Sequence, residues 1–183
     1  MQRSRCLLLI SLLAATGCGD DATCGTMGAP SAGLTASSAE VTLEFGNLTS
    51  LAGNDCSDPA VFPDVVSISL EGGQTNGGQG LFTLCIPRPD LLTSGPRTLG
   101  VFNSMADIRI IDLTGDADGC TFALDSTSPP TGSGSGEGVC DNGNDPAGFA
   151  ISLDGTISLR RTCGATVDTV DVLLQGRVAV TLR

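Results

Sequence analysis

The sequence predicts an all-β protein, and three observations support that class. Apolar residues alternate with polar ones, with a period of two, along most of the chain after Glu40. The apolar segments are short and are bounded by Gly, Pro, Asn and Asp, which favour turns. No segment has the apolar face of an amphipathic helix, although residues 89–93 have room for one helical turn. We therefore expect an antiparallel β-sandwich or jelly roll of about eight strands, with a closed lipocalin-like barrel as the alternative.

Six of the expected strands precede residue 125. Each combines β-branched or aromatic residues with turn residues at its ends. Their expected ranges are Val41–Phe45, Val66–Leu70, Leu81–Ile86, Thr98–Phe102, Ile108–Leu113 and Thr121–Leu124.

The last two expected strands, 148–162 and 168–182, form a long hairpin. Both contain the pattern apolar-x-apolar-x-Gly-x-apolar-x-apolar, in ISLDGTISL and in VLLQGRVAV. A tight turn at either glycine would place apolar and polar residues on the same face of the sheet. A hairpin centred at residues 165–166 instead gives each apolar residue an apolar partner and pairs Gly155 with Gly176. We expect two curved strands, each bent at its glycine.

Between these groups lies STSPPTGSGSGEG (Ser126–Gly138), whose composition predicts a flexible surface loop. Cys120 and Cys140 flank this segment, so a disulfide between them would hold the base of the loop together. The sequence therefore predicts no strand from residue 126 to residue 138.

The composition excludes much of enzyme chemistry. The chain has no His, and all nine of its cationic residues are Arg, so it lacks an imidazole base, a Schiff-base lysine and a P-loop lysine. Its net charge of −11 repels phosphate backbones, which argues against a nucleic-acid partner. We interpret the acidity as that of a solvated surface.

The N-terminus has the form of a secretory signal peptide over residues 1–17. Arg3 and Arg5 precede the apolar stretch Cys6–Ala15, and small residues follow it. That stretch is too short to cross a bilayer, which needs roughly 20 apolar residues.

The sequence Ala15-Thr16-Gly17-Cys18 at the end of this leader resembles the lipobox of bacterial lipoproteins. In that family the leader is cut before the cysteine, which carries the lipid; ordinary cleavage after an Ala-x-Gly site is the alternative. Ala15 departs from the family pattern, which usually has a larger aliphatic residue there. The resemblance implies a bacterial envelope protein attached to a membrane through Cys18. In enterobacterial members an Asp directly after the cysteine retains the protein in the inner membrane, so Gly19 favours the outer membrane.

Cysteine parity supports the lipid at Cys18. Of the eight cysteines, Cys6 is removed with the leader, which leaves seven. In an oxidising compartment an odd number of cysteines leaves one without a disulfide partner. If Cys18 carries lipid, six cysteines remain, enough for three structural disulfides: Cys24, Cys56, Cys85, Cys120, Cys140 and Cys163. Besides the bridge between Cys120 and Cys140, our expected pairs are Cys56–Cys85 and Cys24–Cys163.

The small, polar composition of residues 18–38 predicts a flexible tether, and residues 39–183 then form the β domain. Within that domain, DLTGDADG places Asp112, Asp116 and Asp118 close together in the sequence, as in a calcium loop. The residues depart from the EF-hand frame, so we interpret the segment as an acidic turn, with calcium as the alternative.

We expect a non-catalytic envelope lipoprotein with a structural or protein-binding role and without a cofactor. One alternative is a binding module for calcium, a glycan or a small apolar molecule. A more remote alternative is a hydrolase that uses two carboxyl groups, because glycoside hydrolysis needs no His.

Overall fold

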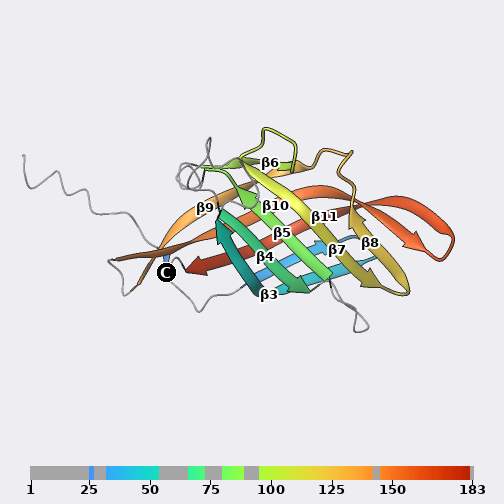
Figure 1. The fold of residues 1–183 in the computed structure, drawn as a ribbon, viewed down its shortest axis with the longest axis horizontal. Helices are drawn as coiled ribbons and strands as arrows, with labels where there is room; N and C mark the ends of the chain where they lie inside the picture. The colour runs from blue at the N-terminus through green and yellow to red at the C-terminus, as the bar shows by residue number, and fades with distance from the viewer. Residues whose placement is uncertain are drawn as a thin grey trace, which may run out of the picture.

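The computed structural model describes residues 25–26, 32–53, 66–72, 80–88, 95–141 and 145–181. These residues contain eleven β-strands and no helix, so the all-β class is confirmed. In chain order the strands are β1 (Gly25–Thr26), β2 (Ala32–Ser37), β3 (Thr42–Gly53), β4 (Val66–Gly72), β5 (Gly80–Ile86), β6 (Arg97–Val101), β7 (Ile108–Ala117), β8 (Cys120–Leu124), β9 (Thr131–Asp141), β10 (Asp145–Cys163) and β11 (Thr166–Thr181) (Figure 1).

All eleven strands belong to one sheet, and the pairings close that sheet on itself. In one direction the strands follow the order β7, β5, β4, β3, β2, β11 and β10. In the other direction β7 reaches β10 by two routes, through β8 at one end and through β6 and β9 at the other. The architecture is therefore a closed barrel, the alternative expected from the sequence, with two sides that pack across a common core.

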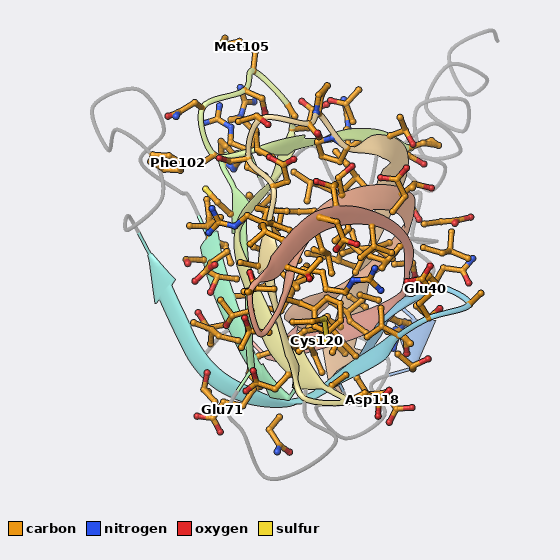
Figure 2. The ribbon with its side chains drawn as sticks, turned by 90° about the vertical axis from the view of Figure 1, so that its right-hand side faces the viewer. Glu40, Glu71, Phe102, Met105, Asp118 and Cys120 are labelled. Carbon is orange, nitrogen blue, oxygen red and sulfur yellow. A yellow bond between two sulfur atoms is a disulfide. The ribbon has the colours of Figure 1, made fainter. Side chains whose placement is uncertain are left out.

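Most of the core is one cluster of buried hydrophobic side chains, and its described members come from every strand from β2 to β11 except β9. Alternation explains how it forms: along residues 151–160 of β10, apolar residues are buried while the residues between them face outward. Phe45 and Phe82 lie in this cluster with their ring centroids 5.6 Å apart. Figure 2 shows the ribbon wrapped around this dense group of side chains.

Each of the eight expected strands is present, and β1, β2 and β9 are additional. Because β2 pairs with both β11 and β3, the barrel includes residues 32–37. The expected boundary at residue 39 is thus too late.

The long hairpin of β10 and β11 is confirmed, but its expected register is wrong by two residues. Cys163 pairs with Thr166 across a two-residue turn, so Gly155 pairs with Leu174 and Leu153 with Gly176. The cause is Gly164, whose φ of 59° supplies the positive value that a tight hairpin turn needs at its first central position. A shift of two leaves each side chain on its expected face, which explains why the pattern of burial is still correct.

The expected loop at residues 126–138 is also wrong from Thr131 onward, where β9 begins and pairs with β10. Gly and Ser are poor strand formers, but here the alternate glycines let two backbones approach closely. Gly132 lies opposite Gly155, and a Cβ on either would overlap the backbone of the other strand. Tertiary pairing therefore overrides the local preference of this segment.

The disulfide pattern corrects two expected pairs. Cys120 is bonded to Cys163, with a Cα–Cα distance of 4.4 Å, so neither Cys120–Cys140 nor Cys24–Cys163 forms. The reason is barrel closure, since β8 pairs with β10 and sets Thr121 opposite Thr162, one position away from the bridge. Cys85 is also disulfide-bonded, to a partner outside the described side chains, so its expected bond to Cys56 stays a prediction.

Candidate interaction surface

The loop between β6 and β7, residues 102–107, exposes two large apolar side chains. Phe102 is 47% exposed and Met105 is 93% exposed. In Figure 2, Met105 stands at the upper edge of the molecule, with Phe102 on the same side of the view. We refer to residues 102–107 as the Phe102 loop.

Hydrogen bonds hold the Phe102 loop in a defined conformation. The Ser104 hydroxyl donates to the Val101 carbonyl oxygen at 2.7 Å and accepts the Ala106 amide at 3.3 Å. Gly100 leaves room for this hydroxyl, because a Cβ there would overlap Ser104 Oγ. The two apolar side chains are thus carried on a loop whose backbone is fixed by its own polar residues.

The end of the loop is fixed against β6. The Thr98 hydroxyl donates to Asp107 Oδ2 at 3.2 Å, and the Asp107 amide donates back to Thr98 Oγ1 at 3.3 Å. Beyond it, Arg109 Nε donates to the Ala106 carbonyl oxygen at 3.1 Å. These contacts tie both flanking strands to the loop.

Our sequence interpretation missed this surface, although the sequence contains a signal for it. The expected strand Thr98–Phe102 has Leu99 and Val101 at alternate positions, and Leu99 is buried. Phe102 has the opposite parity, so a period of two turns it away from the core. An outward Phe followed closely by Met is the pattern that would have identified the loop.

A second polar cluster joins the hairpin to the turn between β2 and β3. Arg161 donates to both carboxylate oxygens of Asp168, at 2.9 and 2.6 Å, and also to Glu40. These hydrogen bonds lower the pKa of Asp168 and raise that of Arg161. Each of the three guanidinium nitrogens donates to a carboxylate of this chain, which fits a structural role.

The structure does not bring the three calcium candidates together in the part of the chain that it describes. Asp112 and Asp116 lie four residues apart on β7, which separates their backbones by about 13 Å. Asp118 is in the two-residue turn to β8, where it and Gly119 have φ values of 52° and 77°. Positive values at both positions identify a type I′ turn, for which Asp-Gly is a favoured sequence. Among the described residues, no three His, Cys, Asp or Glu side chains are placed to hold a metal ion.

No Asp or Glu is buried among the residues whose exposure is described. Asp125 accepts hydrogen bonds from the Thr127 hydroxyl and amide, at 2.6 and 3.0 Å, and these lower its pKa. Asp168 is shifted in the same direction, whereas a catalytic general acid needs a raised pKa. These carboxylates are suited to holding turns and strands in place.

The side chains of the remaining predicted site residues are not among those that the structure describes. The lipidation candidate Cys18, with Cys24 and Cys56, lies outside the described residues, and Cys140 is described only as part of β9. Within the described ranges, no helix is both long and apolar enough to cross a membrane. Comparison with protein families, curated proteins and solved structures finds no match for this chain.

Proposed function

We propose that this protein is a lipid-anchored envelope protein whose barrel acts by binding or as a structural element rather than by catalysis. The observation that carries the proposal is cysteine parity at Cys18. Leader removal leaves seven cysteines, and a lipid on Cys18 leaves an even set of six.

The disulfides support an oxidising compartment for the barrel. Three of those six cysteines, Cys85, Cys120 and Cys163, are disulfide-bonded. Structural disulfides persist in secreted and envelope proteins and are rare in the cytosol. A lipid-anchored protein outside the cytoplasm is consistent with both the leader and these bonds.

The side chains available for chemistry support a non-catalytic role. The chain has no His and no Lys, and its described carboxyl groups reach solvent. The Phe102 loop is the described feature best suited to an interaction, because it combines exposed apolar side chains with a fixed backbone.

Labelling with a clickable fatty-acid analogue in bacteria tests the anchor. We expect the wild-type protein and Cys6→Ala to incorporate the label, because Cys6 leaves with the leader. Cys18→Ala should incorporate none. The mass of the intact mature wild-type protein should exceed that of its polypeptide by the acyl groups. A labelled Cys18→Ala variant, or a mature wild-type chain without acyl mass, would refute the proposal.

A further inference from the structure

We propose that the Phe102 loop inserts Phe102 and Met105 into the surface of the bilayer that holds the lipid anchor, so that the barrel lies with this flank on the membrane. The inference rests on the proposed anchor at Cys18. It adds a second, non-covalent contact between the barrel and the lipid.

The position of β1 places this flank near the membrane. Gly25 is seven residues after Cys18, and a fully extended chain of that length spans at most about 25 Å. β1 pairs with β9 at Val139 and Cys140. A lipid on Cys18 therefore keeps this part of β9 within about 25 Å of the bilayer surface.

The Phe102 loop lies on the same flank of β9 as β1. β10 pairs with one side of β9 along its length, so β1 and β6 both occupy the other side. Gly25 pairs with Val139, and Arg97 pairs with Gly134. These two positions are five residues, or about 17 Å, apart along β9. Phe102 follows β6, about 33 Å from Gly25 along this flank. When the barrel rests on this side of β9, the tether and the Phe102 loop both lie at the membrane surface.

The distribution of charge favours the same orientation. Three of the six described arginines belong to segments next to the loop: Arg97 and Arg109 are on its flanking strands β6 and β7, and Arg88 follows β5, which pairs with β7. Arg109 donates to the Ala106 carbonyl oxygen, and Arg97 is the first residue of β6. Arg88 comes three residues after Cys85, the residue of β5 that pairs with Arg109. In Figure 2 the acidic residues Glu71 and Asp118 lie on the opposite side of the view from Met105. With three arginines against the loop's own Asp107, this part of the molecule is less acidic than the chain as a whole, which favours its approach to anionic headgroups.

The side chains themselves suit the interface of a bilayer. A fixed loop loses little conformational freedom on insertion, and Phe and Met gain by leaving water. Val167, which is 59% exposed, lies in the β10–β11 hairpin, near the end of the barrel that carries the Asp118 turn. It is a matched exposed apolar residue for which no membrane contact is expected.

Tryptophan fluorescence tests the docking, because the chain has no native Trp or Tyr. The full acylated chain, carrying Phe102→Trp, Met105→Trp or Val167→Trp, is reconstituted in vesicles of phosphatidylcholine and phosphatidylglycerol. We expect blue-shifted emission at 102 and 105 and loss of most of it when the acyl chains are brominated. Emission at 167 should keep its aqueous wavelength and its intensity. Far-UV circular dichroism and the intact mass of each variant verify folding and disulfides.

The outcomes separate docking from anchoring. If Cys18 takes up the fatty-acid label but Trp at 102 and at 105 is not quenched, the anchor is retained and docking is overturned. The Phe102 loop would then be a surface for a protein partner. Equal quenching at 102, 105 and 167 would also overturn it, because the contact would then have no orientation. Absence of label at Cys18 would refute the anchor and, with it, this orientation.

Discussion

Single residues fix the hairpin and its neighbours through short-range geometry. Arg161 and Asp168 are directly opposite each other on β10 and β11, and their bidentate contact joins the two strands. Glu40 adds the turn between β2 and β3 to the same guanidinium. One arginine thus links segments that are far apart in the chain, where a lysine could not form the same fork.

This contact predicts a pH dependence of stability. The lowered pKa of Asp168 means that its ion pair stabilises the fold above the unfolded value of 3.8, and that this contribution disappears as pH falls through the folded pKa. Asp168→Asn and Arg161→Gln should therefore be less stable than wild type at neutral pH. Both should lose less stability on acidification to about pH 2.

Urea unfolding followed by far-UV circular dichroism measures these profiles. Asp118→Asn removes the same charge from a turn and controls for the change in net charge. An Asp168→Asn variant with the wild-type stability at neutral pH would show that the pair contributes nothing. The double variant should lose less than the sum of the two single losses, because the two residues share one contact.

At the scale of elements, the strands follow from alternation but their partners do not. β9 is the clearest case, because its Gly- and Ser-rich sequence predicts a loop while its position between β10 and β6 makes it a strand. The same pairing network brings the start of β8 to the end of β10. There the Cys120–Cys163 disulfide closes a segment of 43 residues.

Removing this disulfide should destabilise the barrel measurably. We expect Cys120→Ala/Cys163→Ala to lose about 2–4 kcal/mol of unfolding free energy, mainly because the unfolded chain gains freedom. The adjacent cross-strand pair supplies a control, since Thr121→Ala/Thr162→Ala should cost only about 0.2–1 kcal/mol. Urea unfolding of both proteins makes the comparison. Equal losses would indicate that the bridge adds nothing beyond local pairing.

At the scale of the whole molecule, one closed sheet surrounds one apolar core, while a short loop exposes apolar side chains outside it. Phe82 and Phe102 represent these two environments: the first is fully buried against Phe45, and the second is 47% exposed. Burial rather than residue type therefore decides which phenylalanine stabilises the fold.

Substitution of these two residues tests that distinction. Phe82→Ala should lower the free energy of unfolding by about 3–5 kcal/mol, because it removes a ring from a packed interior. Phe102→Ala should change it by no more than about 0.5 kcal/mol. Thermal or urea unfolding measures both. A large loss at Phe102 would mean that its ring belongs to the core rather than to a surface.

Much of the local architecture could be predicted from the sequence alone. A period of two is a local property, so it predicts the all-β class, eight of the strands and the inward direction of residues such as Leu153 and Leu174. The lipobox-like leader and the cysteine count are likewise local and require no fold. They predict the anchor on which the proposed function rests.

Only the tertiary structure decided which strands are neighbours. Closure of the sheet, the Cys120–Cys163 pair and the strand character of β9 depend on contacts between residues distant in sequence. The same holds for the Phe102 loop, whose position relative to β1 follows from the pairing of β1 and β6 with the same side of β9. The alternation of apolar and polar residues determines which face of the sheet each side chain points to. It does not determine which strand lies next to which, because every residue apart from proline offers the same backbone N–H and C=O groups for pairing.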